Sequence, residues 1–321
     1  MKILVTGGAG YIGSVAVYKL LEAGYQINVI DDLSNGYVEN VDKRASFIQG
    51  SILDENKLNA ALDGVDAVMH LAAKIRVEEG QSNPELYKKV NIEGTLNLIK
   101  ICASKKITKF VFASTATVYG SPEAVPLTEE SKTAPINVYG STKLEIDDYL
   151  ESNSKTLGIS SISLRFFNVG GAIKTSTGKW LRFKHEGATH LIPNILKSSA
   201  EKPMPIFGND WPTKDGTQIR DYVHVSDLAD ALLGSLTKLE EPGNRIINIG
   251  TSTGSTVLEV LAAAETVLNK KIYFKFESRR PGDCFALVTS NSKASQVIGW
   301  EPKKTIGDIL LDAEQELISN T

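Results

Sequence analysis

Short apolar runs alternate with longer amphipathic stretches through the first half of the chain. The apolar runs have the length of buried strands and fall at residues 2–7, 26–31, 66–73, 109–115 and 160–167. The amphipathic stretches carry apolar residues at helical spacing and fall at residues 11–24, 83–105 and 138–151. Alternating strands and helices form right-handed βαβ units, so this pattern predicts a parallel sheet with helices on both faces.

The pattern weakens after residue 168. Residues 170–190 are rich in Gly, Lys and Thr and show no period, so we expect a loop or a boundary there. Further along, Thr256 and Thr305 each precede an acidic residue three positions later, which is the pattern of a capped helix start. The second half is therefore expected to be a smaller, mixed unit.

Together these elements predict the α/β class, with a doubly wound, Rossmann-like parallel sheet and a second, smaller mixed α/β substrate domain. We expect the first domain over residues 1–168 and the second over residues 169–321. Part of 220–250 is expected to return to the first domain. A chain of 321 residues divides more readily into two cores than one.

Composition and charge exclude several classes of function. The 35 basic residues are balanced by 38 acidic ones, and no basic block stands out, so we expect no nucleic-acid partner. No apolar run approaches the roughly 18 residues of a membrane span, and the N-terminus lacks a signal-peptide pattern. The cysteines, Cys102 and Cys284, are expected to be free thiols in a reducing cytoplasm. The four histidines do not cluster with other ligands, so we expect no metal site.

A glycine loop follows the first predicted strand. Gly7, Gly10 and Gly13 lie between that strand and the next helix, where they allow a tight turn and close approach to a pyrophosphate. Asp31 ends the second strand, where a carboxylate can accept hydrogen bonds from ribose hydroxyls and repel a 2′-phosphate. The loop and Asp31 together predict NAD as the cofactor.

A hydroxyl, a phenol and an ammonium follow at the centre of the predicted sheet. Thr115 ends the strand 109–115, and ligands of parallel sheets sit beyond the carboxyl ends of strands. Tyr139 and Lys143 are spaced to share one face of a helix. A tyrosine base working near pH 7 needs a pKa shift of about 3 units. A positive charge about 4 Å away at an effective dielectric of about 20 is sufficient in principle.

These features resemble the extended short-chain dehydrogenase/reductase family. The stretches 206–231, 279–288 and 189–193 are similar to those of the UDP-glucose (UDP-galactose) 4-epimerases within it, and the resemblance covers essentially the whole chain. It implies a UDP-sugar substrate and tightly bound NAD. C4 of the hexose would be oxidised transiently to a 4-keto group and reduced from its other face, with Tyr139 as base.

The resemblance also implies which residues hold the ligands. Arg220 and Arg280 would bind the diphosphate, Asp283 a ribose hydroxyl, Phe207 the uracil and Asn168 the sugar or diphosphate. The remaining substrate residues implied are Thr115, His190, Leu191 and Leu287. The cofactor residues implied are Gly7, Gly10, Tyr11, Ile12, Gly13, Asp31, Asp32, Asn35, Ser51, Ile52, Leu71, Ala72, Ala73, Asn91, Tyr139, Lys143 and Phe166. A homodimer built from the helices 84–104 and 138–152 is implied as well.

Some positions depart from the family pattern and leave more than one function open. Ser51 stands where an aspartate is common, and Ile75 where a polar or basic residue is common, so NAD is expected to exchange more easily. Leu287 occupies the position that often gates substrate size, which keeps UDP-N-acetylhexosamines open as substrates. A 4,6-dehydratase is disfavoured because Ala116 and Thr117, rather than two acids, follow Thr115. A non-catalytic NAD-sensing protein is the alternative from another class.

Overall fold

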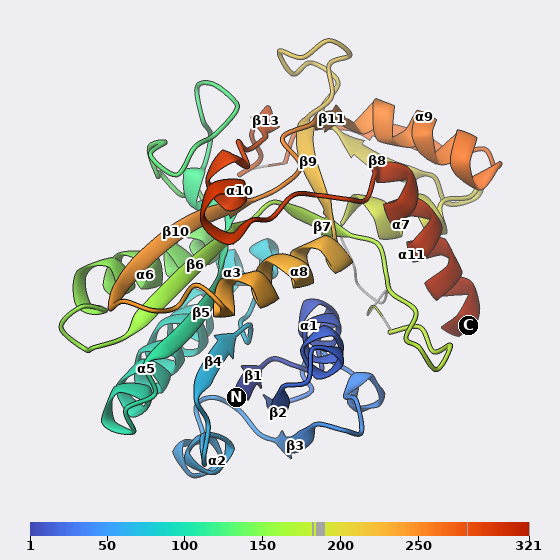
Figure 1. Ribbon diagram of the computed structural model, residues 1–321. Coiled ribbons are helices and arrows are strands. Elements are labelled where there is room, and N and C mark those ends of the chain that lie inside the picture. The colour runs from blue at the N-terminus through green and yellow to red at the C-terminus, as the bar shows by residue number, and fades with distance from the viewer. Residues whose placement is uncertain (182, 184–189, 281, 321) are drawn as a thin grey trace.

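The computed structural model describes residues 1–181, 183, 190–280 and 282–320. Its largest element is a seven-stranded sheet with the order β10-β6-β5-β4-β1-β2-β3 (Figure 1). Every neighbouring pair in this sheet is parallel. The strands are β1 (Lys2–Thr6), β2 (Gln26–Asp31), β3 (Ser46–Gln49), β4 (Ala67–His70), β5 (Lys109–Thr115), β6 (Ser160–Phe166) and β10 (Gly243–Ile249). The doubly wound parallel sheet expected from the sequence is confirmed.

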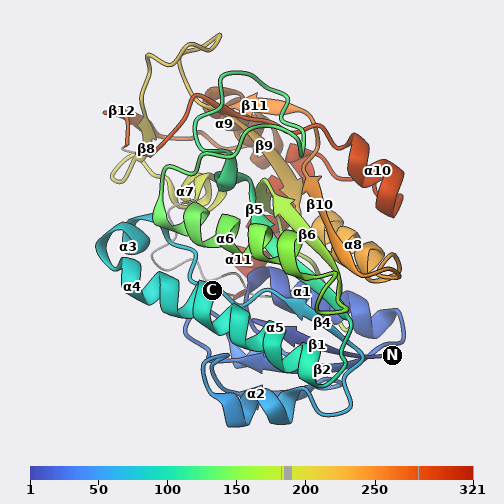
Figure 2. The ribbon, with the colours of Figure 1, turned by 90° about the vertical axis from the view of Figure 1, so that its left-hand side faces the viewer.

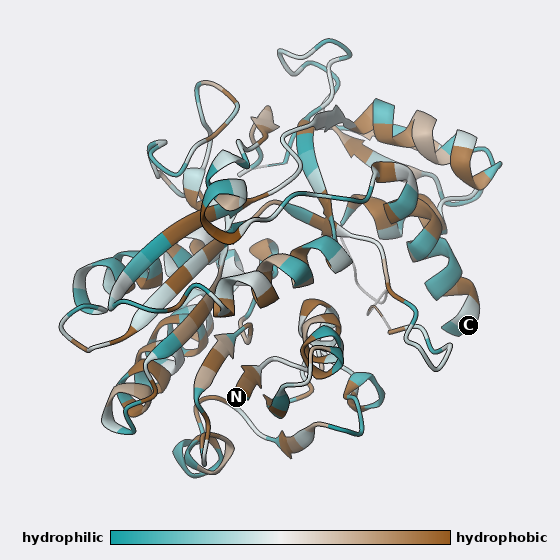
Figure 3. Ribbon diagram, viewed as in Figure 1, coloured by the Kyte–Doolittle hydropathy of each residue, from teal (hydrophilic) through white to brown (hydrophobic). Residues whose placement is uncertain are grey.

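Helices cover both faces of this sheet and bury a separate apolar core on each. One face packs against α1 (Tyr11–Glu22), α8 (Val225–Leu236) and α10 (Ser292–Ile298). The other face packs against α2 (Glu55–Ala61), α5 (Thr95–Ser104) and α6 (Val138–Asn153). The strands are largely apolar toward both faces because helices exclude water from each side, and β1 and β4 are mostly brown in Figure 3.

The helix expected over 83–105 is continuous in space but not regular. It begins as α4 (Pro84–Tyr87), passes through a π-helical segment (Lys88–Gly94) and ends as α5. Pro84 occupies its first turn, where the missing N–H costs nothing. This helix and α6 lie side by side along the outside of the sheet (Figure 2). The π-helical segment faces α6, and such segments occur often at functional sites.

The second half of the chain contributes to both parts of the molecule. The strand β10 pairs with β6 over its whole length, and α8 packs against α1, so residues 225–249 belong to the large sheet and its cover. The remaining strands form two small sheets, from β7 (Asn168–Gly170), β9 (Ile219–His224), β11 (Gly254–Thr256) and β13 (Ala286–Leu287), and from β8 (Met204–Phe207) and β12 (Phe274–Glu277). A further core forms between α7 (Leu191–Lys197), α9 (Val257–Leu268) and α11 (Ile306–Asn320).

The predicted helix starts and the predicted loop correspond to observed features. Thr256 and Glu259 form a reciprocal capping box at the start of α9, and Thr305 exchanges hydrogen bonds with Asp308 at the start of α11. Residues 171–181 form neither a helix nor a ladder, and residues 182 and 184–189 of the expected loop lie outside the described residues. No helix in the described part of the chain is long and apolar enough to span a membrane.

Candidate active site

A cavity of about 920 Å³ lies where the carboxyl ends of the large-sheet strands face the smaller sheets. One wall comes from the ends of β1, β2, β4 and β5 and from the start of α6. The other comes from β8, β9 and β13 and from the segment around Arg280. The cavity therefore joins the two parts of the molecule, as expected for a ligand site at the carboxyl edge of a parallel sheet.

The glycine loop after β1 forms part of the first wall of the cavity. Gly7 has a φ of 72°, and a Cβ there would lie 2.8 Å from the backbone nitrogen of Ala72. A Cβ on Gly13 would lie 2.0 Å from the carbonyl oxygen of Gly7. Gly10 begins α1 without a side-chain cap, which leaves the first N–H groups of that helix open to a ligand. The loop therefore has the shape and polarity of a pyrophosphate cradle.

Asp31 is fixed at the end of β2 beside this loop. Its carboxylate accepts hydrogen bonds from the backbone N–H groups of Ala9 at 3.0 Å and Leu33 at 2.8 Å. Burial raises the pKa of Asp31, and these N–H groups oppose that rise. The carboxylate lies next to the glycine loop, so these residues fit a dinucleotide with free ribose hydroxyls.

Thr115, Tyr139 and Lys143 line the cavity between the two walls. Asn137 caps α6 by accepting from the backbone N–H of Gly140 at 2.8 Å, so the phenol of Tyr139 is carried by the first turn of a well-defined helix. Thr115 is the last residue of β5. Burial raises the pKa of Tyr139 to about 12, and the nearby Thr115 hydroxyl opposes this rise.

Lys143 lies one helical turn beyond Tyr139 on α6 and is buried. Its ammonium donates a hydrogen bond to the carbonyl of Ala113 at 2.8 Å and lies 4.7 Å from the centre of the Phe112 ring. Burial lowers the pKa of Lys143 to about 7, and the charge of Asp147 opposes this. Burial is therefore the dominant effect at both groups: it raises the pKa of the Tyr139 phenol and lowers that of the Lys143 ammonium.

The second wall carries the expected arginines. Arg280 is held by a bond from its Nε to Asp283 at 3.1 Å, and its guanidinium stacks 4.3 Å from the Phe207 ring centre. Arg220 donates to the carbonyls of Ile219 and Cys284, at 2.8 and 3.1 Å, which fixes its fork at the cavity wall. Two planar guanidiniums facing one cavity are suited to a diphosphate.

The structure brings together all but one of the site residues named from the sequence. The residues that line the cavity are Gly7, Gly10, Tyr11, Ile12, Gly13, Asp31, Asp32, Asn35, Ser51, Ile52, Leu71, Ala72, Ala73, Thr115, Tyr139, Lys143, Phe166, Asn168, His190, Leu191, Phe207, Arg220, Arg280, Asp283 and Leu287. Asn91 is the exception, because it is buried within the π-helical segment. Its side chain bonds the backbone N–H and carbonyl of Lys74, at 2.8 and 2.9 Å, and Thr142 of α6 at 3.1 Å.

Further lining residues carry no signal in the sequence. Arg76 and Glu78 come from the start of α3 (Val77–Ser82), and Glu78 lies 3.8 Å from Arg280. Phe183 stacks edge-on against Tyr11 at 4.8 Å, and Glu316 reaches the cavity from the last helix. Long-range packing places them there, and no local motif marks them.

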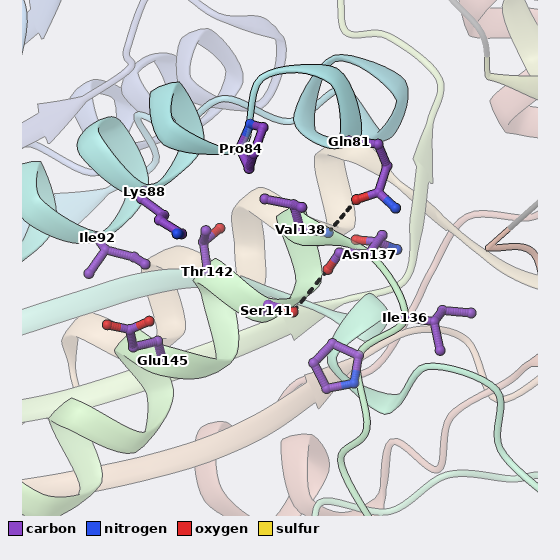
Figure 4. A pocket seen from close by; sticks show the side chains of 11 residues that line it. Gln81, Pro84, Lys88, Ile92, Ile136, Asn137, Val138, Ser141, Thr142 and Glu145 are labelled. Carbon is purple, nitrogen blue, oxygen red and sulfur yellow. Dashed lines mark hydrogen bonds between the residues drawn. The ribbon is translucent and has the colours of Figure 1, made fainter.

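A smaller cavity of about 390 Å³ lies behind the active-site wall (Figure 4). It opens between α4 and the start of α6, and Gln81, Ile136 and Asn137 line both cavities. Gln81 accepts a hydrogen bond from the backbone N–H of Val138 at 3.2 Å, which ties α3 to the helix that carries Tyr139. Among the described residues, no group of His, Cys, Asp or Glu is arranged to hold a metal ion.

Comparison with known proteins agrees with this geometry. Residues 3–250 match the NAD dependent epimerase/dehydratase family. This chain belongs to that family. It is 40% identical over 308 residues to the UDP-glucose 4-epimerase of Corynebacterium glutamicum, and the match covers 95% of this chain and 92% of the relative.

Solved structures of the family superpose over nearly the whole chain. A UDP-glucose 4-epimerase from Stenotrophomonas maltophila, with bound NAD and formylated UDP-arabinopyranose, has a TM-score of 0.94 and 32% identity, covering 100% of this chain and 98% of that one. The UDP-Glc/GlcNAc 4-epimerase of Campylobacter jejuni has a TM-score of 0.83 and 35% identity, and the match covers 98% of this chain and 99% of that one. The family is NAD-dependent, and its epimerases are isomerases.

Proposed function

We propose that this chain is a UDP-glucose/UDP-galactose 4-epimerase that inverts C4 of a UDP-hexose with tightly bound NAD. The observation that carries the proposal is one cavity in which Thr115, Tyr139 and Lys143 lie between a dinucleotide wall and a wall with two arginines. The similarity to named epimerases over 95% of the chain supports the same reaction.

The chain's own residues supply binding and proton transfer. Arg220 and Arg280 neutralise the diphosphate, which directs the hexose toward Thr115 and Tyr139. The Thr115 hydroxyl orients the O4 group, and the Tyr139 phenolate takes its proton and later returns it. When bound, NAD+ supplies the hydride acceptor and the positive ring charge that the site needs beside Lys143. The glycine loop and Asp31 would hold it.

The substrate range is proposed to extend toward N-acetylated sugars. Leu287 lines the cavity, belongs to the same buried apolar cluster as Phe167 and Cys284, and presents an aliphatic side chain of intermediate size. The UDP-Glc/GlcNAc 4-epimerase of Campylobacter jejuni has the same fold over 98% of this chain. UDP-N-acetylhexosamines are therefore the second candidate substrates.

A dehydratase and a non-catalytic sensor have less support from the geometry. A 4,6-dehydratase needs an acid and a base beside the catalytic threonine, but Ala116 and Thr117 line the cavity there. A non-catalytic NAD sensor does not need a phenol and an ammonium at the junction of two ligand walls, and both are present.

The proposal is tested by incubating the purified protein with UDP-galactose and separating the products. We expect UDP-glucose from the wild type and none from Tyr139→Phe, because that variant lacks the proton acceptor. Both proteins should retain NAD. Wild-type turnover in Tyr139→Phe would contradict the mechanism, and an inactive wild type that retains NAD would favour the sensor.

We further propose a cytoplasmic homodimer. Both cysteines are free and buried, as is common in a reducing compartment. The helix over 84–104 and α6 lie side by side at the surface (Figure 2), and the smaller cavity lies between them (Figure 4). We propose that these helices form a helical bundle with those of a second copy. Light scattering after gel filtration should give twice the chain mass, and a monomer mass would contradict the dimer.

A further inference from the structure

Asp147 lies on the face of α6 that carries Tyr139 and Lys143, one turn beyond the lysine. Its side chain is 0% exposed. It sits among apolar neighbours of the same helix, Ile146 and Leu150, which form part of the sheet-facing core. Burying a carboxylate among apolar groups costs free energy unless the carboxylate is paired and hydrogen-bonded. The hydrogen-bond partners of Asp147 therefore indicate its role.

The partners of Asp147 come from two neighbouring strands, β5 and β6. Its Oδ2 accepts a hydrogen bond from Ser114 Oγ at 2.8 Å and another from Arg165 Nε at 3.0 Å. Arg165 is itself 3% exposed and donates from Nη1 to the Tyr119 hydroxyl at 3.0 Å. The Tyr119 hydroxyl donates to Asn248 Oδ1 on β10 at 2.7 Å. One buried chain of hydrogen bonds therefore joins α6 to β5, β6 and β10.

This chain of bonds fixes the strand end that carries the catalytic threonine. Lys143 bonds the carbonyl of Ala113, and Asp147 bonds the hydroxyl of Ser114. The next residue is Thr115, the last of β5. The same helix thus holds two successive residues of β5 immediately before Thr115, which sets the position of Thr115 relative to Tyr139.

Asp147 also supplies the negative charge that favours the ammonium form of Lys143. The charged or titratable groups that interact with Lys143 are Asp147 from α6 and His70 from β4. Tyr139 lies one turn before Lys143 on α6, and Arg165 of β6 pairs with Asp147. His70 is buried and its pKa is lowered to about 3, so it is neutral near pH 7. The charge of Asp147 raises the pKa of Lys143 against the larger effect of burial.

We propose that Asp147 is a positioning residue of the epimerase site. Its buried carboxylate, held by Ser114 and Arg165, fixes the end of β5 against α6 and favours the ammonium form of Lys143. Stability alone gives little reason for a buried ion pair, because apolar groups of the same volume stabilise a core equally well. The inference rests on the proposed function.

The test compares Asp147→Asn with Asp147→Glu and with Asp148→Asn. Asparagine preserves the shape and an acceptor oxygen but removes the charge, and glutamate restores the charge. Asp148 is the exposed neighbour on the same helix, so Asp148→Asn is the matched control. The measurements are kcat and KM for UDP-galactose across pH, the NAD content of the purified proteins and their melting temperatures.

Asp147→Asn should lower kcat at pH 7 by about tenfold or more with little change in KM, because the reacting groups are displaced but the UDP contacts are intact. Its acid limb of kcat should move to higher pH by about one unit, because phenolate formation loses the support of the ammonium. Asp147→Glu should recover part of kcat and return the acid limb of the kcat profile to its wild-type pH. Asp148→Asn should match the wild type in both.

Several results would overturn the proposal. A folded, NAD-loaded Asp147→Asn with wild-type kcat would remove the positioning role, and a uniform loss with an unmoved acid limb would remove the role of the charge. If Asp147→Asn does not fold, Ser114→Ala replaces it. That variant keeps all charges, so kcat should fall without a shift of the limb, and an unchanged kcat would contradict the proposal.

A second readout does not depend on substrate. The phenolate absorption of Tyr139, taken as the difference between a protein and its Tyr139→Phe partner, should appear at higher pH in Asp147→Asn than in the wild type. Equal titrations would overturn the proposal. If the wild type converts no UDP-hexose, the proposed function fails while this titration still decides the role of Asp147.

Discussion

The behaviour of Tyr139 is set by opposing effects at a single residue. Burial raises its pKa to about 12, whereas the neighbouring ammonium of Lys143 is directed at the carbonyl of Ala113. A positive charge near the phenol would oppose this effect of burial, and NAD+ held by the glycine loop would supply one on its nicotinamide ring. If the charge of bound NAD+ is needed to lower the pKa of Tyr139, the phenol stays protonated until NAD+ is bound.

Leu287 is the residue at which substrate size can be changed most directly. Replacement by alanine should raise kcat/KM for UDP-N-acetylgalactosamine relative to UDP-galactose by about tenfold, because the shorter side chain leaves room for the acetyl group. Leu287→Tyr should lower the same ratio. Val288→Ala is the control, since Val288 is buried beside Leu287 but does not line the cavity. An unchanged ratio in both Leu287 variants would contradict a size gate.

Residues that belong to local motifs can be named from the sequence, and those placed by distant packing cannot. Gly7, Asp31 and Tyr139 follow strand ends or share a helix face, so their meeting at one sheet edge is predictable. The spacing of Asp147 places it on the helix face of Tyr139 and Lys143, but its pairing with Arg165 of β6 is long-range and has no local signal. The family resemblance places Asn91 in the cofactor site, but its polar groups are used within the protein.

At the scale of elements, His70 joins β1, β4 and α5. Its ring nitrogens bond the Thr6 hydroxyl at 2.7 Å and the Thr95 hydroxyl at 2.8 Å, and the ring stacks on Phe112. The Thr95 hydroxyl donates in turn to the carbonyl of Asn91 in the π-helical segment. The imidazole therefore links the glycine-loop strand to the irregular helix beside the active site.

This link predicts a pH dependence of stability. Burial, and to a lesser degree Lys143, lowers the pKa of His70 from 6.5 to about 3. Between these values the unfolded chain binds a proton that the folded chain does not. The free energy of unfolding should therefore fall as the pH decreases from 6.5 toward 3, at on the order of 1.4 kcal/mol per pH unit. Urea unfolding at several pH values measures this slope.

His70→Gln should show a shallower dependence of the free energy of unfolding on pH over the same range, because it has no imidazole at this position to bind a proton on unfolding. The variant should also be less stable at neutral pH, since the amide does not replace the stacking on Phe112. A slope equal to that of the wild type would show that His70 is not the group that titrates.

Strand and helix alternation in the first half is visible in the sequence because each element has its own period. The π-helical segment (Lys88–Gly94) is not visible in the sequence, because its residues still have the apolar spacing of a continuous α-helix. The sequence predicts that part of 220–250 returns to the first domain, but it does not locate the strand β10. Its place beside β6 depends on a pairing between residues about 80 positions apart, which local periodicity does not report.

For the whole molecule, we propose domains over 1–168 and 169–321, with 225–249 completing the first. Leu164 of β6 lies beside Ile247 of β10, and both are fully buried in the core that α8 also covers. A fragment ending at residue 168 would expose that core and the edge of β6 to water.

The fragment 1–168 should therefore show no cooperative thermal transition by circular dichroism. The same fragment with residues 225–250 joined through a flexible linker should recover one, because α8 and β10 restore the edge strand and its cover. A cooperative transition in the shorter fragment would contradict this division of the core.

The central claim is that C4 is inverted by removal and return of its own hydrogen as hydride. UDP-galactose deuterated at C4 tests it most directly, with the product analysed by mass spectrometry and NMR after turnover in ordinary water. We predict UDP-glucose that retains deuterium at C4, because a carbon-bound hydrogen that is transferred and returned as hydride does not exchange with solvent protons. Product with hydrogen from water at C4 would contradict the account.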